Sequence, residues 1–257
     1  MRRPRGFTLI ELVVIIVVIG ILMAGTVVYI TNSVTAYSAV ARRDQMTSLG
    51  RVTVERIVRD LRSALPNSIR VANNCIEFLP ILSGSTYLTL PVDSAATSFT
   101  TADFTLPTYS GSAYVVVYPY NQTALYAQSN PGAIVAFTSK SGTPTSTITL
   151  GSSFRFVHHA PHRRFYIVNA PTSYCVVGNN LNRYRGYSIS AIQATPPSAS
   201  AELVAQNIQL NDGGVVLPFR YTPGTLQRNA IVALDFRFLI DGEWIKLSHE
   251  VQVRNVL

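Results

Sequence analysis

Charged side chains are scarce in this sequence. They make up 13% of the 257 residues, whereas apolar residues make up 47%. Globular domains usually carry about 25% charged residues. Part of the deficit comes from one very apolar segment near the start, and the rest from a body rich in Ser, Thr, Tyr and Val, a composition typical of a β-rich, secreted-type domain. The length allows one fairly large domain, or one domain with a long appendage.

Cysteine is almost absent. Cys75 and Cys175 are the only two, and neither belongs to a CxxC pair, so a structural zinc site, which needs more ligands at closer spacing, is disfavoured. In an exported protein two lone cysteines more often form a disulfide. A bridge between them would close a loop of about 100 residues, worth ~4 to 5 kcal/mol in the chain-entropy model. The alternative is two buried free thiols.

Motifs of catalysis and cofactor binding are missing too. No GxSxG elbow frames a nucleophile, and no glycine-rich loop could hold a phosphate. His158, His159 and His162 lie close together, but without a carboxylate or cysteine nearby in sequence, which favours a polar turn over a metal site. Asn211-Asp212 offers a single acid for calcium, which is typical of a turn. The sequence therefore predicts no enzyme, no cofactor and no metal.

A membrane-length apolar run occupies the N-terminal region. No charged residue occurs from Leu12 to Ile30, 19 residues that span about 28 Å as a helix, close to the ~30 Å bilayer core. Arg2, Arg3 and Arg5 precede the run and favour a cytoplasmic N-terminus, with the remaining chain outside. The net charge is +8, and removal of these three arginines would leave 18 basic and 13 acidic side chains. This mild excess is weak support for a nucleic-acid partner.

Glu11 distinguishes between three interpretations of this segment. A secretory signal would have a shorter apolar region with a small-residue cleavage site after it, although Ala24-Gly25 supplies small residues. A plain single-pass anchor has no use for a carboxylate, which costs about 2.5 to 3.5 kcal/mol at a helix centre and less near its end. A functional acid that meets a positive partner is the third interpretation.

The string Gly6-Phe7-Thr8-Leu9-Ile10-Glu11 resembles the class III signal of type IV prepilins and type II secretion pseudopilins. The resemblance implies cleavage between Gly6 and Phe7 by a prepilin peptidase and N-methylation of Phe7. It implies that Glu11 meets the α-amino group of a neighbouring subunit, where opposite charges in a low dielectric relieve each other's desolvation. It also implies a bacterial inner-membrane protein with a periplasmic head, which joins an assembly platform and other major and minor pilins in an extracellular pilus.

The predicted fold is α+β: a long N-terminal helix packed on a C-terminal antiparallel β-sheet head. Residues 1–6 form the leader, 7–30 the transmembrane and filament-core helix, 31–66 an amphipathic extension and 67–257 the head. No proline interrupts 7–65, and Pro66-Asn67 predicts the helix end. One apolar stripe should bury against the head: Met46, Leu49, Val52, Ile57, Leu61 and Ala64.

Short apolar runs separated by turn signals predict the strands of the head. The clearest hairpin is 231–240 and 243–253 around Asp241-Gly242. The others are 69–71, 76–82, 114–118, 133–137, 147–150, 154–158, 165–168, 174–177, 186–190 and 215–221. We expect surface loops at 93–112 and at 195–201, and neither an internal repeat nor a second domain.

Several later stretches resemble the MshO-type minor pilins of the mannose-sensitive haemagglutinin (MSHA) pilus, with related heads in PilW-type minor pilins and J-type pseudopilins. These stretches are 56–70, 165–168 with Tyr174-Cys175, 183–187 and 247–256. The resemblance implies a low-copy structural subunit that helps to start assembly near the filament tip. Two alternatives remain: a minor pseudopilin of type II secretion, and an adhesive or DNA-binding tip module. In the second, the tyrosines with Arg163, Arg183 and Arg185 would bind DNA or a surface glycan by stacking.

Overall fold

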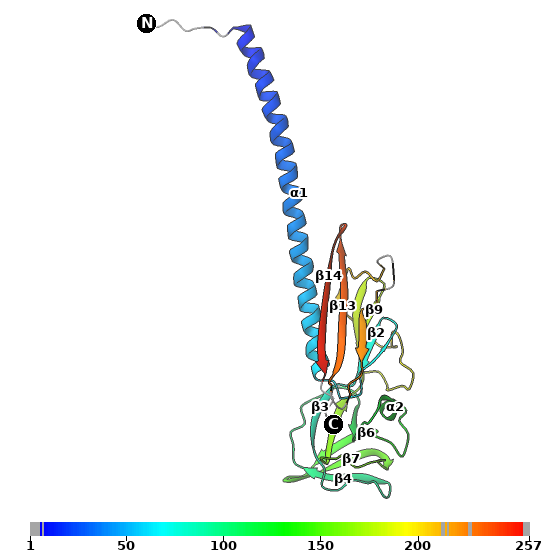
Figure 1. The fold of residues 1–257 in the computed structure, drawn as a ribbon. Helices are drawn as coiled ribbons and strands as arrows, with labels where there is room; N and C mark the ends of the chain where they lie inside the picture. The colour runs from blue at the N-terminus through cyan, green and yellow to red at the C-terminus, as the bar shows by residue number, and fades with distance from the viewer. Residues whose placement is uncertain (1–5, 7, 212–213, 215, 226–227, 254–257) are drawn as a thin grey trace.

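A computed structural model describes residues 6, 8–211, 214, 216–225 and 228–253. The first element is a single helix, α1 (Leu9–Arg62), of 54 residues and about 80 Å in length. Figure 1 shows that only its C-terminal part lies against the head, while its N-terminal part extends far beyond it. The helix ends near the residue expected, because Arg62 is followed by the Pro66-Asn67 turn signal.

The two halves of α1 differ in what surrounds them. Its first buried residue is Met46, and the buried positions that follow form one stripe toward the head: Gly50, Thr53, Val54, Ile57, Val58 and Leu61. Val52, expected within this stripe, is instead 65% exposed, and Val54 and Val58 take the inward positions. The stripe is thus rotated slightly from the one predicted, since Gly50 sets the closest approach to the head: a Cβ there would lie 1.9 Å from Leu247 Cδ1.

Two antiparallel sheets pack with this part of α1. The five-stranded sheet has the order β1-β2-β9-β10-β11, and the three-stranded sheet the order β12-β13-β14. Their bounds are β1 Arg70–Ala72, β2 Cys75–Phe78, β9 Thr172–Val177, β10 Asn180–Arg185, β11 Ala201–Ala205, β12 Phe219–Thr222, β13 Ala230–Ile240 and β14 Glu243–Val253. Their apolar faces and the helix stripe share one core, in which Tyr174, Phe236 and Phe238 are fully buried.

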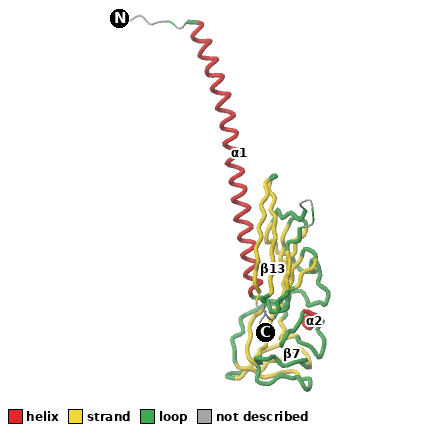
Figure 2. Tube along the Cα trace, viewed as in Figure 1, coloured by secondary structure: helices red, strands yellow, loops and turns green. Residues whose placement is uncertain are grey.

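A six-stranded antiparallel sheet forms the end of the head farthest from the N-terminus (Figure 1), with the order β3-β8-β5-β6-β7-β4. Its bounds are β3 Ile81–Thr86, β8 Arg164–Asn169, β5 Ala113–Val116, β6 Ile134–Ser141, β7 Thr145–Phe154 and β4 Ala96–Ala102. Its own core centres on the edge-to-face rings of Phe99, Phe156 and Phe165. Figure 2 shows that strands and loops dominate the head and that the short helix α2 (Gln122–Tyr126) lies at its side.

The helix end joins these two parts of the head. Leu65 N–H donates to Leu79 O at 2.8 Å, and Ile81 N–H donates to Ser63 O at 2.8 Å. Leu65, Leu79 and Val116 belong to a third apolar cluster. The direction of α1 is therefore set by backbone hydrogen bonds to the connection between the five-stranded and six-stranded sheets.

The α+β class, with a long apolar helix on antiparallel sheets, is confirmed. The hairpin of β13 and β14 is also as predicted: Asp241 and Gly242 both have positive φ, 48° and 81°, as a type I′ turn requires. Three expectations were wrong. The loop expected at 93–112 contains β4, the strand expected at 186–190 is irregular, and the separate strand expected at 154–158 is not formed, because β7 ends at Phe154 and only an isolated bridge involves Phe156. The run expected at 215–221 is represented by β12, and Val215 lies outside the described residues.

Candidate functional site: the start of the long helix

Thr8 caps the N-terminus of α1. Its backbone is extended, its side chain accepts a hydrogen bond from Glu11 N at 3.4 Å, and its carbonyl accepts one from Leu12 N at 3.2 Å. A Thr at the N-cap with Glu three residues later is the sequence signature of a capping box. This signal fixes the first helical residue as Leu9, whereas the helix was expected to begin at residue 7.

Glu11 lies in the first turn of α1 with its side chain exposed. The helix dipole favours an acid there by about 0.3 to 1 kcal/mol. No ion pair involves Glu11 among the described residues. Gly6 is described and exposed, whereas the leader residues 1–5 and Phe7 lie outside the described residues.

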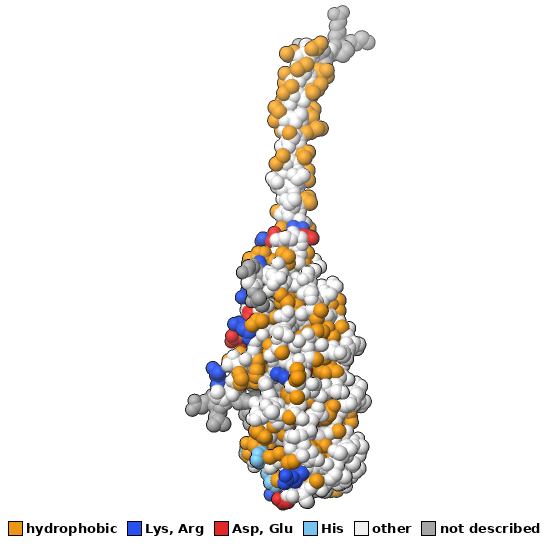
Figure 3. All heavy atoms as spheres, turned by 90° about the vertical axis from the view of Figure 1, so that its right-hand side faces the viewer, with side chains coloured by type: hydrophobic (Ala, Val, Ile, Leu, Met, Phe, Trp, Pro, Cys, Tyr) orange, Lys and Arg blue, Asp and Glu red, His pale blue; other side chains and the backbone are white. Residues whose placement is uncertain are grey.

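The segment that follows has the length and composition to cross a membrane. Every side chain from Leu9 to Ala36 is exposed, and Figure 3 shows this part of the helix covered with apolar side chains. Its hydroxyl groups are satisfied within the helix, since Thr26 Oγ1 donates to Leu22 O at 3.0 Å and Thr31 Oγ1 to Val27 O at 3.0 Å. Such bonds to the preceding turn let hydroxyl side chains face an apolar medium.

Polar contacts tie the C-terminal part of α1 to the five-stranded sheet. Tyr174 Oη donates to Asp60 Oδ2 at 2.6 Å, and Arg183 bridges Asp60 at 3.2 Å and Glu202 at 2.8 Å. Arg56 also pairs with Glu202. Burial and the adjacent Asp60 carboxylate raise the pKa of Tyr174 far above its ordinary value, so the hydroxyl remains a donor. These contacts hold the C-terminal part of the helix against the head.

A disulfide joins Cys75 to Cys175, with the sulfurs 2.05 Å apart. The two residues are register partners on the neighbouring strands β2 and β9, and both are buried. The bridge therefore lies inside the sheet that carries Tyr174, and it links segments 100 residues apart in sequence.

The structure separates the arginines that the sequence suggested as one binding surface. Arg183 is only 12% exposed and binds Asp60 and Glu202, and Arg185 also pairs with Glu202. Arg163 lies instead on the connection between β7 and β8. Two of the three histidines of that connection pack on aromatic rings: His158 against Tyr118 and Tyr120, and His159 on Tyr87.

Residues 1–27 match the family model described as "Prokaryotic N-terminal methylation motif". No curated protein and no solved structure matches the chain significantly. The matched residues cover the capped helix start, Glu11 and most of the membrane-length run. They support a type IV pilin-like or pseudopilin-like subunit, a class of structural proteins rather than enzymes, which is processed by a prepilin peptidase, interacts with other pilins and is anchored in a membrane before assembly.

Proposed function

We propose that the protein is a minor pilin: a structural subunit that is cleaved between Gly6 and Phe7, methylated on Phe7 and incorporated into a type IV pilus near its tip. The observation that carries this proposal is Glu11, an exposed acid at the start of a membrane-length helix with no described partner. A charged group in the membrane costs a few kcal/mol. The helix dipole offsets at most ~1 kcal/mol of this cost for Glu11. A free amino group at residue 7 of a neighbouring subunit would supply the missing positive charge.

The head favours a minor rather than a major subunit. In the family that the N-terminal motif indicates, major pilins are usually shorter, and their C-terminal disulfide closes a small loop. Here the disulfide spans 100 residues, and a second, six-stranded sheet extends the head beyond the helix end. Assignment to the MSHA pilus is the finer part of the proposal, and it rests on the resembling stretches 56–70, 183–187 and 247–256. A pseudopilin of type II secretion is the alternative.

Replacement of Glu11 by Val tests the proposal. With Glu11→Val as the only copy, the protein should reach the membrane fraction at normal levels, but its amount in sheared filaments should fall to background. Asp44→Val is the matched control, since Asp44 is an exposed acid on the same helix beyond the membrane-length run. Mass spectrometry of the assembled protein should find a mature N-terminus at methylated Phe7. Normal incorporation of Glu11→Val, or a mature chain that starts elsewhere, would refute the pairing.

A second function of the head is favoured by the aromatic cluster at the end farthest from the helix. Tyr118, Tyr120 and His158 lie with ring centroids 5.6 to 6.4 Å apart, and Tyr120 is 46% exposed. Arg155 and Arg163 lie on the same connection as His158, and no described acid pairs with either. Figure 3 shows histidine and basic side chains at this end. We propose that this surface binds single-stranded nucleic acid by stacking and phosphate contacts.

This second proposal predicts salt-sensitive retention of oligothymidine by the full chain in detergent. Tyr120→Ala should weaken binding at every salt concentration, because stacking on one ring contributes about 1 to 3 kcal/mol. Tyr29→Ala, in the membrane-length segment, is the control. Binding that Tyr120→Ala leaves unchanged would exclude the cluster.

A further inference from the structure

The outer edge of β14 is open. In β13, Asp235 N–H donates to Pro218 O at 3.0 Å, and Arg237 O accepts from Gln209 N at 2.8 Å. These backbone groups point away from β14. In an antiparallel pair, two opposite residues direct their backbone N–H and C=O groups either toward each other or both away from each other. Ser248 and Lys246 are opposite Asp235 and Arg237, so their backbone groups point away from β13.

The same alternation applies along the whole strand. Leu239 N–H donates to Asn207 O at 2.9 Å, so the backbone groups of its partner Trp244 also point outward. Glu250 and Gln252 follow at two-residue steps, and their backbone groups point the same way. No described residue forms a backbone hydrogen bond with these five positions on the outer side. An 11-residue strand with an unpaired edge is a template for another strand.

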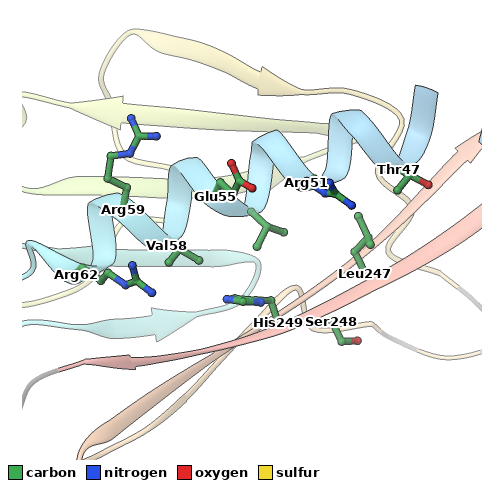
Figure 4. A pocket seen from close by; sticks show the side chains of 10 residues that line it. Thr47, Arg51, Glu55, Val58, Arg59, Arg62, Leu247, Ser248 and His249 are labelled. Carbon is green, nitrogen blue, oxygen red and sulfur yellow. The ribbon is translucent and has the colours of Figure 1, made fainter. Parts of the chain in front are cut away.

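A groove of about 740 Å³ lies between this strand and α1, within the range of pockets that hold ligands. Its floor is apolar: Val54 and Val58 of the helix and Leu247 of β14. Figure 4 shows the helix side chains along one side, with Leu247 and His249 on the facing strand. This β14 groove therefore combines an apolar floor with an adjacent row of free backbone groups.

The rim of the β14 groove is basic. Arg51, Arg59 and Arg62 line it from the helix, with Glu55 as the one acid among them and His249 on the strand. All five side chains are exposed, and no ion pair or side-chain hydrogen bond involves them within the described part of the chain. The Glu55–Arg59 pair that the helical spacing suggests is thus not formed, and the rim retains three guanidinium groups for one carboxylate.

A second copy of this chain does not supply the complementary strand. The other edge strands of its three sheets are β1, β11, β12, β3 and β4. Among them only β11 carries an acid, Glu202, and it is already bound by Arg56, Arg183 and Arg185. β14 itself carries Glu243, which is bound by Arg43, and Glu250, whose side chain lies on the face of the strand opposite Leu247 because side chains alternate along a strand. Pairing with a second β14 therefore brings neither acid to the arginine rim, and we take the occupant to be a chain of different sequence.

We propose that the β14 groove receives an extended, carboxylate-bearing segment of a different filament subunit, which pairs as a strand with β14 while its acids meet Arg51, Arg59 and Arg62. The identification of the partner as a filament subunit rests on the proposed function. The strand pairing and the preference for acids rest on the groove alone. Backbone hydrogen bonds to the edge would give the affinity, and the arginine rim would select the partner.

Binding of short peptides to the full chain in detergent tests the proposal. The probe is a fluorescein-labelled peptide of alternating Val and Glu, measured by fluorescence anisotropy. One control peptide has Lys in place of Glu, and another is N-methylated at alternate residues along one edge. The acidic peptide should bind saturably, the lysine peptide about tenfold more weakly or worse, and the methylated peptide not at all.

Two variants separate the parts of the proposal. Arg51→Glu/Arg62→Glu should weaken the acidic peptide about tenfold and improve the lysine peptide, whereas the matched reversal Arg155→Glu/Arg164→Glu should change neither. Ser248→Pro removes one outward N–H without altering charge and should weaken both peptides. Equal binding of the acidic and lysine peptides, undiminished binding of the methylated peptide, or no effect of the groove reversal would overturn the proposal.

Failure of this proposal is distinguishable from failure of the proposed function. Glu11→Val should bind the acidic peptide as well as the unaltered chain, because Glu11 lies far along the helix from the groove. Filament incorporation without peptide binding would overturn strand addition alone. Peptide binding without filament incorporation would overturn the pilin role alone.

Discussion

Removal of Arg70 should strongly destabilise the head. Glu77 is 1% exposed, and its Oε1 accepts from Arg70 Nε at 2.9 Å and from a second guanidinium nitrogen at 2.7 Å. Arg70 also donates to the carbonyls of Ser190 and Ala191 and lies 3.6 Å from the ring centroid of Tyr126. Loss of one partner from a buried pair typically costs about 3 to 5 kcal/mol. We expect Arg70→Met to lower the free energy of unfolding by about that amount.

The pH dependence of this loss follows from Glu77. Burial raises the pKa of its carboxyl above the ordinary value despite the opposing attraction of Arg70. For an acid with a raised pKa in the folded state, the stabilisation is present below the unfolded pKa and is lost as pH rises through the folded pKa. Arg70→Met removes the opposing attraction, which raises that pKa further. The variant should therefore approach the stability of the original chain as pH falls.

Denaturant unfolding of the full chain in detergent, followed by the fluorescence of Trp244, measures these changes. Arg70→Met/Glu77→Gln should recover much of the loss, since no buried charge remains. Arg185→Met is the control, and it should cost less than ~1 kcal/mol because its ion pair is exposed. A loss below ~1 kcal/mol for Arg70→Met, or a loss that is the same at all pH values, would refute the reasoning.

Two further predictions concern the five-stranded sheet. Cys75→Ala/Cys175→Ala should lower the free energy of unfolding by about 4 to 5 kcal/mol, the chain-entropy value for a loop of this length. If reductant leaves the melting temperature of the original chain unchanged, this prediction is contradicted. Tyr174→Phe should cost about 1.5 to 3 kcal/mol, because its hydroxyl donates to the charged Asp60. Since burial and Asp60 raise the pKa of Tyr174 in the fold, its contribution is present at neutral pH and is lost in strong alkali. Burial also raises the pKa of Tyr126 and Tyr187, so ultraviolet titration of Tyr174→Phe should show one fewer tyrosine that ionises only on unfolding than the original chain.

Local signals made the long helix and the last hairpin predictable. The uncharged run, the lack of proline and the Pro66-Asn67 stop define α1 without reference to the remaining chain. Asp241-Gly242 between two alternating runs defines the β13–β14 turn. The start of the functional site was predictable for the same reason, because Gly6 to Glu11 are contiguous in sequence.

Elements decided by distant contacts were not predictable in this way. The strand β4 is rich in Thr and Ser and has one large apolar residue, Phe99, whose burial depends on Phe156 and Phe165 from other strands. The β14 groove depends on how closely α1 approaches β14, and Gly50 permits this approach at Leu247. Arg51, Arg59 and Arg62 lie outside the predicted apolar stripe, but helical periodicity does not indicate which open strand edge they face.

The exposed apolar surface of α1 is longer than a membrane requires. About 20 residues span a bilayer, and the 19 residues from Leu12 to Ile30 nearly suffice. Yet Val34, Tyr37 and Val40 continue at three-residue spacing and are 60 to 78% exposed. Residues at this spacing share one helix face, and the head covers none of them. Lipid therefore accounts for the first part of the apolar surface but leaves the second part in water. Packing against helices of other subunits would bury both, which is why the free helix favours a filament subunit over a simple membrane anchor.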